Sequence, residues 1–359
     1  MLSALSNCTG SSFLARKHYT RAMTTTKTAA GEGMMRAIWV EKVGEPEVLE
    51  LRELPIPALK PGFVKLKVEA VGINFADVLA VGGKYLTPTQ TPLVPGMEFA
   101  GTVTELGQGV TGFTVGQQVA CLGGRGGMAE YAVVPAQTLT PIPAGLNFAE
   151  AAAFPVSYYT AYMTLVTLGQ AREGETVLVQ GAAGALGTAL IQVALALKLK
   201  VIALASSEDK LALARTLGAH HTLISERGDL VDAVKDIAGK QGVNLVVEIT
   251  GGEMVGKSLK MLGNRGRLLI VGAASQEAAS INPTLLMKKN LSVIGVWLTS
   301  MMGEPGVLED AVAFFAPLIA SGQIRPQVGP GYPLAQSAQA FRDILARKTT
   351  GKVIIAPQE

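Results

Sequence analysis

Cysteine is scarce in this chain, with only Cys8 and Cys121 among 359 residues. Two cysteines cannot build a disulfide framework or a cysteine-rich metal cluster, and such scarcity is typical of a reducing compartment. Aromatic residues are also few, at 5% of the chain, whereas 41 residues are glycine. This composition favours an α/β protein with many tight turns over a disulfide-stabilised one.

Long apolar runs and a net charge on the body of the chain are missing too. The most apolar region, residues 182–205, is interrupted by two glycines, a glutamine and two lysines, so it divides into a helix and a strand rather than one membrane span. Residues 35–359 contain 27 basic and 27 acidic side chains. This balance argues against nucleic acids and acidic surfaces as partners.

The first 34 residues differ from the rest in charge and composition. They contain four basic residues and one acidic residue, with many serines, threonines and alanines. An Arg-containing, Ser-rich and acid-poor leader is typical of a mitochondrial transit peptide, which predicts a mitochondrial protein. Two alternatives stay open: an untargeted tail on a cytoplasmic protein, or a chain whose true start is Met23, Met34 or Met35.

What the chain does contain is a strand–helix–strand pattern between residues 175 and 219. A glycine turn follows the apolar run at residues 176–179 and reads A-x-G-x-x-G from Ala182 to Gly187. In such a turn the middle glycine lets the backbone approach a pyrophosphate, and the helix N terminus attracts its negative charge. The sequence therefore predicts a dinucleotide site with contacts from Ala183, Gly184, Ala185, Leu186 and Gly187.

The end of the second strand, after Ala205, predicts which dinucleotide the site prefers. A carboxylate there would bind the ribose 2′-hydroxyl of NAD and repel a 2′-phosphate. Here Ser206, Ser207 and Lys210 follow instead, and two hydroxyls and an ammonium suit a phosphate. Two acidic neighbours weaken the positive charge, and a helix cap by one of the serines is the alternative. The pattern favours NADPH over NADH as the cofactor.

Secondary-structure patterns divide the remaining chain into two domains. Short strands dominate residues 35–157, whereas strands alternate with helices in residues 158–298, which implies a parallel sheet wound on both faces. A last strand near residues 351–355 predicts a return to the first domain. We therefore expect an α/β fold in which a doubly wound, parallel-sheet (Rossmann) domain, residues 158–298, is inserted in a β-rich catalytic domain, residues 35–157 plus 299–359.

Five segments spread over most of the chain resemble one family. They are GINFADVLAVGGKY (72–85), PLVPGMEFAGTV (92–103), AAAFPVSYYTAY (151–162), GETVLVQGAAGALG (174–187) and TTGKVII (349–355). Together they resemble the medium-chain dehydrogenase/reductase superfamily, and within it the zinc-independent quinone oxidoreductase branch, to which zeta-crystallin and the quinone oxidoreductase-like proteins belong. The resemblance implies that the β-rich domain is GroES-like.

The resemblance also implies that no metal takes part. Zinc alcohol dehydrogenases of the same superfamily have a Cys in the region of Asn74 and a His beside Glu98, where this chain has Asn74 and Met97. The residues at 121–128 do not correspond to the loop that binds structural zinc in those enzymes. Because a zinc site needs three or four N, S or O ligands, metal-assisted alcohol oxidation is not expected.

A reductase without a Lewis acid needs an acceptor that already attracts hydride, such as a quinone or an α,β-unsaturated carbonyl. After hydride transfer, an oxygen of the acceptor needs a hydrogen-bond donor or a proton. By resemblance to enoyl-thioester reductases of the superfamily, Tyr85 is the expected catalytic proton donor, with a wall of the substrate pocket as its alternative role. The expected function is NADPH-dependent, zinc-free reduction of a small quinone or enone.

The resemblance implies further contacts with the cofactor. Asn74, the second expected catalytic residue, faces the nicotinamide and ribose, or else stabilises a turn. Thr160 lies by the nicotinamide, or else on a helix surface. Lys352 reaches the pyrophosphate, or else is an exposed strand residue. A loop after a buried strand passes beside the nicotinamide half of the cofactor, with contacts from Gly272, Ala273 and Ser275.

Two other functions stay open. The leader and Tyr85 are compatible with a mitochondrial enoyl-thioester reductase. The crystallin and vesicle-protein relatives suggest instead an NADPH-binding protein with a structural or trafficking role. For assembly, the apolar strand expected at Leu291–Trp297 would leave unpaired backbone groups at a sheet edge. We therefore expect a homodimer formed through this strand.

Overall fold

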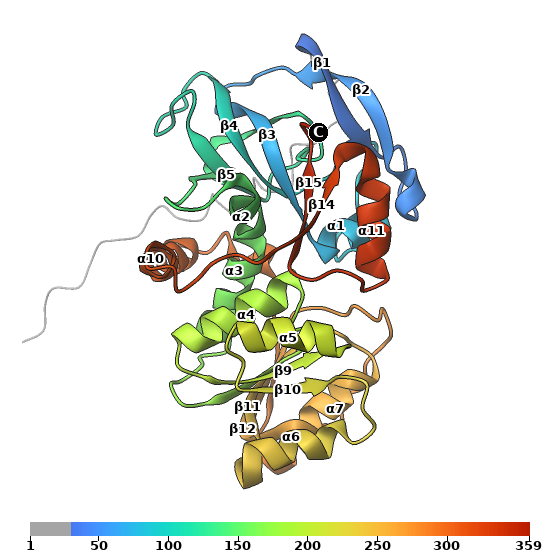
Figure 1. Ribbon diagram of the computed structural model, residues 1–359, viewed down its shortest axis with the longest axis vertical. Helices are drawn as coiled ribbons and strands as arrows, with labels where there is room; N and C mark the ends of the chain where they lie inside the picture. The colour runs from blue at the N-terminus through green and yellow to red at the C-terminus, as the bar shows by residue number, and fades with distance from the viewer. Residues whose placement is uncertain (1–29) are drawn as a thin grey trace, which may run out of the picture.

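The computed structural model describes residues 30–359, which form two large β-sheets stacked along the long axis of the molecule (Figure 1). A six-stranded sheet lies in the lower half of this view and a seven-stranded sheet in the upper half. Residues 1–29, most of the predicted leader, lie outside the described residues. Residues 30–34 belong to strand β1 (Ala30–Trp39), so β structure begins earlier than the expected Met35.

The six-stranded sheet contains the glycine turn. Its order is β10-β9-β8-β11-β12-β13, and every neighbouring pair is parallel. The order reverses between β8 and β11, and ligands of doubly wound folds bind in the crevice at the carboxyl ends of the strands at such a point. The strands are β8 (Thr176–Val179), β9 (Lys200–Ala205), β10 (His221–Ile224), β11 (Val243–Glu248), β12 (Leu262–Ile270) and β13 (Ser292–Gly295).

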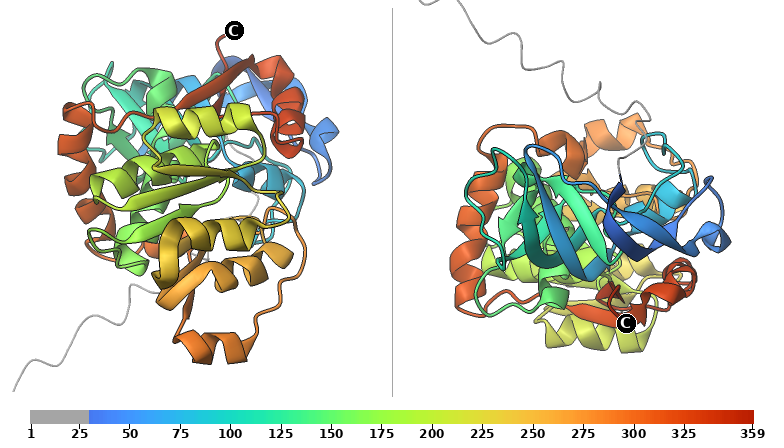
Figure 2. Two further views of the ribbon diagram at one scale, coloured as in Figure 1. Left: turned by 60° about the horizontal axis from the view of Figure 1, so that its bottom comes forward. Right: turned by 90° about the horizontal axis from the view of Figure 1, so that it is seen from above.

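Helices cover both faces of this sheet (Figure 2, left). Because successive strand side chains point to opposite faces, Val177 and Val179 pack in one core with Leu190 of α4. Leu178 packs in another core with Val234 of α6. The predicted doubly wound α/β fold is confirmed. The helices after these strands are α4 (Ala185–Ala196), α5 (Glu208–Thr216), α6 (Leu230–Ala238), α7 (Glu253–Met261) and α8 (Pro283–Lys289).

The seven-stranded sheet is built from both ends of the described chain. Its order is β14-β15-β3-β4-β5-β7, and β6 also pairs with β3. In Figure 1, β14 and β15 (red) lie beside β3 (blue), and β15 pairs antiparallel with β3, so the predicted return of the last strand is confirmed. The strands are β3 (Phe63–Ile73), β4 (Glu98–Leu106), β5 (Gln118–Leu122), β6 (Tyr131–Pro135), β7 (Leu139–Pro141), β14 (Val328–Pro333) and β15 (Lys352–Ala356).

The remaining elements flank the seven-stranded sheet or connect it with the six-stranded one. Strand β1 pairs with β2 (Glu50–Pro57) in a separate two-stranded sheet. Short 3₁₀ turns lie at residues 46–48, 136–138, 239–241 and 334–336. The remaining helices are α1 (Phe75–Val81), α2 (Phe148–Ala153), α3 (Pro155–Tyr162), α9 (Leu298–Met301), α10 (Val307–Ala320) and α11 (Ser337–Leu345). The predicted domain boundaries stay a prediction, and the one at 157/158 lies inside α3.

The helical segment that begins with α3 has two parts. Its second part, Met163–Leu168, is a π-helix, in which the N–H of Gly169 donates to the carbonyl of Thr164, five residues back (2.9 Å). The Thr164 hydroxyl also donates to the carbonyl of Thr160 (2.6 Å). Such back-bonding by a Thr side chain bends a helix, and apolar periodicity alone does not reveal it.

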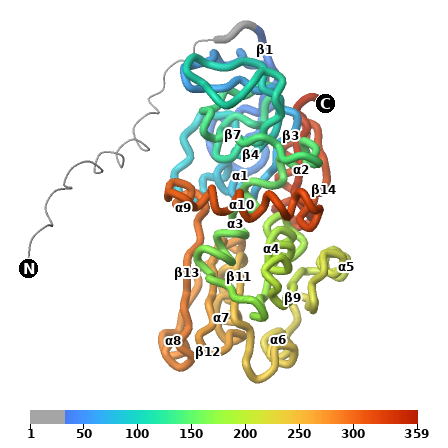
Figure 3. The backbone as a smooth tube through the Cα atoms, turned by 90° about the vertical axis from the view of Figure 1, so that its left-hand side faces the viewer, coloured from blue at the N-terminus to red at the C-terminus, as the bar shows by residue number. Residues whose placement is uncertain are grey.

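The strand expected at Leu291–Trp297 is shorter, since β13 ends at Gly295. Val296 makes one further sheet-like hydrogen bond, to the carbonyl of Ile270 (2.8 Å), and Trp297 is then the N-cap residue of α9. Figure 3 shows β13 at one edge of the six-stranded sheet. Among residues 30–359, we find no helix with the length and apolar character needed to cross a bilayer.

Candidate nucleotide and acceptor site

The glycine turn lies between β8 and α4, where the strand order reverses. Gly187 is required by the protein itself, because a Cβ there would overlap the carbonyl oxygen of Gly181 and the backbone of Ala182. Gly184 differs, since among the described atoms a Cβ there would meet only the Gly181 oxygen, at an ordinary 3.4 Å. The space beside Gly184 is therefore open, and a side chain would fill the place that a pyrophosphate needs.

The first turn of α4 supplies backbone donors beside this space. Gly184 is the N-cap residue, and the first N–H groups of any α-helix lack intrahelical partners. Those groups here belong to Ala185, Leu186 and Gly187, and the helix dipole adds positive potential at the same place. The predicted contact residues are thus gathered around one helix N terminus, while their contact with a cofactor stays a prediction.

A buried carboxylate connects the turns on both sides of the crevice. Glu248, at the end of β11, is fully buried and accepts hydrogen bonds from Gln180 Nε2 (2.7 Å) and Ser258 Oγ (2.6 Å). Its other oxygen accepts from the N–H groups of Thr250 (2.8 Å) and Gly251 (2.9 Å). Because Gln180 leads directly into the glycine turn, these five residues, termed the Glu248 cluster, fix the turns after β8 and β11 relative to each other.

The loop after β12 packs against the turn after β11. The N–H of Ser275 donates to the carbonyl of Thr250 (2.7 Å). A Cβ on Gly251 would contact Ser275 Oγ at 3.1 Å and Ala273 Cα at 3.2 Å, so the two loops approach closely. The loop that contains Gly272, Ala273 and Ser275 therefore lies against the turn after β11, while its contact with the nicotinamide half stays a prediction.

Two cations meet at the end of β9. Lys210 Nζ donates to the backbone carbonyl of Arg347 (2.5 Å). Burial lowers the pKa of Lys210, and the neighbouring positive charge of Arg347 lowers it further. An anion placed here would relieve this repulsion between like charges. The sequence did not reveal Arg347, because it lies in the loop after α11, 137 positions from Lys210.

The two predicted serines lie between β9 and Lys210. Ser206 is exposed, and Ser207 is the N-cap residue of α5. Ser207 therefore occupies the cap position of the alternative, but within the described residues its hydroxyl makes no cap hydrogen bond. The nearby carboxylate of Glu208 pairs with Arg215 (2.5 Å). The end of β9 thus offers hydroxyls and two positive charges, which is the chemistry that binds a phosphate.

A second buried ionic group lies in the seven-stranded sheet, at the junction of β15, β4 and α1. Lys352 is 1% exposed, and its Nζ donates to Glu98 Oε2 and to Asn74 Oδ1 (2.6 Å). Asn74 Nδ2 donates to the same Glu98 oxygen (3.0 Å). Asp77 accepts from the backbone N–H groups of Asn74 (2.9 Å) and Met97 (3.3 Å). The four residues Lys352, Glu98, Asn74 and Asp77 are termed the Lys352 cluster.

One carboxyl group of the Lys352 cluster titrates at mildly acidic pH. Burial raises the pKa of Asp77 to about 6. The backbone N–H of Asn74 and the charge of Lys352 act in the opposite direction, and the charge of Glu98 adds to the rise. The cluster therefore carries one ammonium and two carboxyl groups, and Asp77 takes up a proton as the solution becomes mildly acidic.

Lys352 corrects one expectation. The exposed-strand alternative is wrong, because the side chain is buried and its ammonium binds Glu98 and Asn74. The backbone N–H of the preceding Gly351 donates to the carbonyl of Ala183 (2.8 Å), so β15 begins beside the glycine turn. A contact between Lys352 and the pyrophosphate would therefore require the ammonium to leave both acceptors.

Zinc does not fit the Lys352 cluster. Its ligands in proteins are thiolates, imidazoles and carboxylates, and here the Glu98 carboxylate is hydrogen-bonded by an ammonium and an amide. A second, divalent cation at this carboxylate would be repelled by Lys352. In the part of the chain that the structure describes, three or more His, Cys, Asp or Glu side chains are nowhere grouped as metal ligands.

Tyr85 lies in the loop after α1 and is half-buried. Its hydroxyl oxygen accepts a hydrogen bond from Trp297 Nε1 (3.1 Å). Trp297 follows β13, so this contact places Tyr85 at the carboxyl end of the six-stranded sheet, the end that carries the glycine turn. Thr160 is 8% exposed on α3, so its helix-surface alternative is wrong. The roles of both residues toward a cofactor or acceptor stay predictions.

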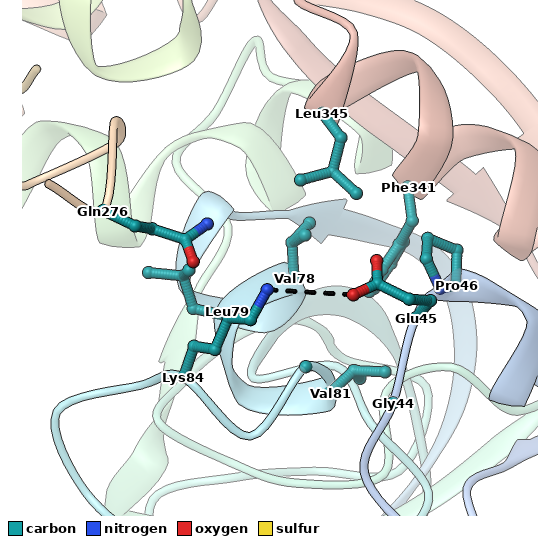
Figure 4. Close-up of a pocket in the computed structure, with 11 residues that line it drawn as sticks. Gly44, Glu45, Pro46, Val78, Leu79, Val81, Lys84, Gln276, Phe341 and Leu345 are labelled. Carbon is teal, nitrogen blue, oxygen red and sulfur yellow. Dashed lines mark ion pairs between the residues drawn. The ribbon is translucent and has the colours of Figure 1, made fainter.

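Figure 4 shows a small cavity where α1 meets the loop after β12. Leu79 and Phe341 line it, Gln276 reaches it from the loop after β12, and Lys84 pairs across it with Glu45 (3.7 Å). Its volume of about 20 Å³ suffices for a single water molecule. The cavity is too small for a substrate that accepts hydride, but it shows that α1 and the loop after β12 face each other.

Comparison with known proteins agrees with this geometry. Residues 60–144 match the family model "Alcohol dehydrogenase GroES-like domain", and residues 185–316 match "Zinc-binding dehydrogenase". The chain is 38% identical over 323 residues to quinone oxidoreductase-like protein 2 of Bos taurus, which covers 89% of this chain and 92% of that protein.

Two solved structures extend the comparison. The quinone oxidoreductase of Thermus thermophilus, also solved with NADPH, has a TM-score of 0.79 and 43% identity, covering 90% of this chain and 100% of that one. The Escherichia coli quinone oxidoreductase, solved with NADPH, has a TM-score of 0.82 and 28% identity, with coverage of 90% and 100%. The chain belongs to the quinone oxidoreductase family of the medium-chain dehydrogenase/reductase superfamily.

Proposed function

We propose that this oxidoreductase uses NADPH to reduce small quinones or α,β-unsaturated carbonyls, without a metal. The observation that carries the proposal is the open glycine turn at α4 together with the two cations, Lys210 and Arg347, at the end of β9. The first suits a pyrophosphate and the second suits the 2′-phosphate that distinguishes NADPH from NADH. Relatives whose structures contain NADPH support the same cofactor.

NADPH supplies hydride when it is bound. The α4 N terminus would hold the pyrophosphate of the bound cofactor, and Lys210 and Arg347 after β9 would hold its 2′-phosphate. The Lys352 cluster takes the place where zinc enzymes of the superfamily polarise their substrate, so the acceptor must already be electrophilic. Tyr85 then donates its hydroxyl proton to the acceptor oxygen on which negative charge develops.

The cofactor assignment is tested by removing the two cations separately. We expect Lys210→Ala and Arg347→Ala each to raise the Kd for NADPH about tenfold, the size of one charge-assisted hydrogen bond, and to leave the Kd for NADH within about twofold. Lys200→Ala is the matched control, because Lys200 is exposed at the opposite end of β9. Equal weakening of both nucleotides would remove Lys210 and Arg347 from the phosphate site.

The acceptor assignment is tested with a panel. NADPH oxidation is measured with a small quinone, a conjugated enone and an enoyl-thioester. Turnover of the first two supports the proposal, whereas turnover of the enoyl-thioester alone supports the alternative reductase function. NADPH binding without turnover of any of the three would favour a structural or trafficking role. Tyr85→Phe should lower kcat without changing the Kd for NADPH if the phenol donates the proton.

Metal independence is tested by elemental analysis of the purified protein. One matching family model is described as zinc-binding, but the ammonium of Lys352 disfavours a dication at Glu98. We expect less than about one-tenth equivalent of zinc per chain, the level of adventitious binding, and full activity after treatment with a chelator. Stoichiometric zinc, or activity lost to the chelator, would contradict a metal-free reaction.

We further propose a homodimer and mitochondrial import. Strand β13 ends the six-stranded sheet and pairs with β12 on one side, and an unpaired edge favours association with a second copy. Light scattering at micromolar concentration should give twice the chain mass, and a monomer would contradict this. Fusion of residues 1–34 to a fluorescent protein should direct it to mitochondria, whereas a diffuse cytoplasmic signal supports the untargeted alternative.

A further inference from the structure

The hydrogen bond between Trp297 and Tyr85 has a fixed direction. An indole N–H donates and cannot accept, so the Tyr85 oxygen is the acceptor in the 3.1 Å contact. The hydroxyl proton of Tyr85 is then left to point at a different acceptor. This contact therefore restrains the Tyr85 oxygen and leaves its proton available to an acceptor other than Trp297.

The two side chains come from different parts of the fold. Tyr85 belongs to the loop after α1 of the seven-stranded sheet, and Trp297 follows the last strand of the six-stranded sheet, 212 positions away. The preceding residue, Val296, is 6% exposed and bonded to Ile270, so the backbone that carries the indole is anchored to the sheet. The indole is therefore a rigid support for a side chain on a loop.

We propose that Trp297 is a positioning residue that directs the Tyr85 proton to the acceptor oxygen and stabilises the tyrosinate that remains. This role rests on the proposed reductase function. A hydrogen bond to the charged form of an acid favours that form, and the bond from an indole N–H becomes charge-assisted once the tyrosine has lost its proton. Trp297 would therefore act on the reaction through Tyr85.

The proton and electron balance is simple for a conjugated enone. Hydride adds to the β-carbon, and the π electron pair moves onto the carbonyl oxygen. That oxygen takes the Tyr85 proton to give the enol, which tautomerises to the saturated ketone in water. The tyrosinate regains a proton from solvent, so each turnover consumes one NADPH and one proton. A halogenated quinone differs, because its reduced oxyanion is a weak base and needs the acid less.

This difference between acceptors gives the kinetic test. Trp297→Phe keeps a ring but removes the N–H, and the loss of one hydrogen bond in the transition state should lower kcat with the enone about fivefold. With a halogenated quinone we expect less than about a twofold loss, since general-acid assistance scales with the basicity of the oxygen. The Kd for NADPH should not change. Trp39→Phe, whose indole bonds the exposed Glu41, is the matched control.

A double variant separates positioning from packing. If Trp297 acts only through the Tyr85 hydroxyl, then Tyr85→Phe with Trp297→Phe should have the same kcat as Tyr85→Phe alone. Losses that multiply in the double variant would contradict the proposal. A loss in Trp297→Phe that is equal for enone and quinone would also contradict it, because a purely structural role lowers both alike.

A spectroscopic measurement tests the hydrogen bond without turnover. The chain has two tryptophans, so protein labelled with ¹⁵N-tryptophan gives two indole N–H signals, and Trp39→Phe assigns them. Tyr85→Phe should shift the Trp297 signal and leave that of Trp39 in place; an unshifted Trp297 signal would contradict the proposal. Absence of NADPH oxidation by the wild type would contradict the proposed function itself, whereas an active wild type with an unshifted signal contradicts only the role of Trp297.

Discussion

Each sheet buries one carboxylate near the crevice, and the two are stabilised by opposite means. Glu98 in the seven-stranded sheet is bound by the ammonium of Lys352, together with an amide and a backbone N–H. Glu248 in the six-stranded sheet is bound by four neutral donors from side chains and backbone. The stability of a buried carboxylate that is paired with a cation depends mainly on that cation. The stability of a buried carboxylate that is bound by several neutral donors does not depend on any single donor.

The difference matches what each cluster does in the fold. The Glu248 cluster joins two turns of a nucleotide crevice, so its donors are spread over both turns and the helix behind them. The Lys352 cluster joins β15, β4 and α1, and its ammonium pairs with the buried Glu98 carboxylate. An ion pair thus stabilises the buried carboxylate of the Lys352 cluster, whereas neutral hydrogen bonds fix the two turns that the Glu248 cluster joins.

The largest expected effect comes from removing the ammonium. Lys352→Ala should lower the free energy of unfolding by about 3–5 kcal/mol, because it leaves the Glu98 carboxylate buried without its counter-charge. Urea unfolding followed by circular dichroism measures this, with Lys240→Ala, at an exposed position, as the control. A loss below about 1 kcal/mol would mean that the buried pair does not depend on its cation.

A double change sharpens the same comparison. Lys352→Met with Glu98→Gln removes both charges and should be more stable than Lys352→Ala, since replacing a whole buried ion pair costs less than breaking it. If the double variant is less stable than Lys352→Ala alone, uncompensated charge is not the cause of the loss.

The raised pKa of Asp77 should make the free energy of unfolding depend on pH. Its pKa of about 6 lies above the unfolded value of 3.8, so the folded state binds the extra proton between these values. The contribution of Asp77 is therefore fully present below pH 3.8 and is lost as the pH rises through 6, about 3 kcal/mol in total. Wild type minus Asp77→Asn should show this decline in urea unfolding between about pH 4 and 7. The exposed Asp236→Asn should not, and parallel curves for wild type and Asp77→Asn would refute the assignment.

Removing the charge of Glu248 should destabilise the protein less than removing the charge of Lys352. Glu248→Gln keeps one acceptor oxygen but places an amide N–H₂ against existing donors, so we expect a loss of about 1–3 kcal/mol, below that of Lys352→Ala. Affinity for NADPH, measured by fluorescence titration, should fall with it, because both turns loosen. The exposed Glu226→Gln serves as the control, and a loss larger than that of Lys352→Ala would reverse the comparison.

The smallest effect is expected from a single neutral donor. Ser258→Ala removes one of the four hydrogen bonds to Glu248 and should cost about 1 kcal/mol in urea unfolding. Because three donors remain, nucleotide affinity should change less than about twofold. A cost above about 3 kcal/mol would show that the four donors do not share the charge.

Local patterns were sufficient for much of the fold and for half of the site. The open position at Gly184, the alternating strands and helices, and the serines after β9 all depend on neighbours in sequence, and the structure confirms the parallel sheet that they imply. The apolar periods indicated the alternation of strands and helices but not the irregular end of one helix, the π-helix at Met163–Leu168.

The other half of the site depends on partners far apart in the chain. Lys352 meets Glu98 across 254 positions, Tyr85 meets Trp297 across 212, and Lys210 meets Arg347 across 137. A lysine in a strand has no local signal that it is buried, because only the partner carboxylate makes burial tolerable. The sequence therefore left open an exposed Lys352, which is wrong, and gave no indication of Arg347 or of the contact made by Trp297.

The backbone bond from Gly351 to Ala183 has a mechanical consequence. Gly351 contacts the glycine turn, where a nucleotide would bind, and the next residue, Lys352, carries the buried ammonium of the seven-stranded sheet. The glycine turn of the six-stranded sheet and strand β15 of the seven-stranded sheet are therefore joined here by a backbone hydrogen bond, one residue before the buried ammonium.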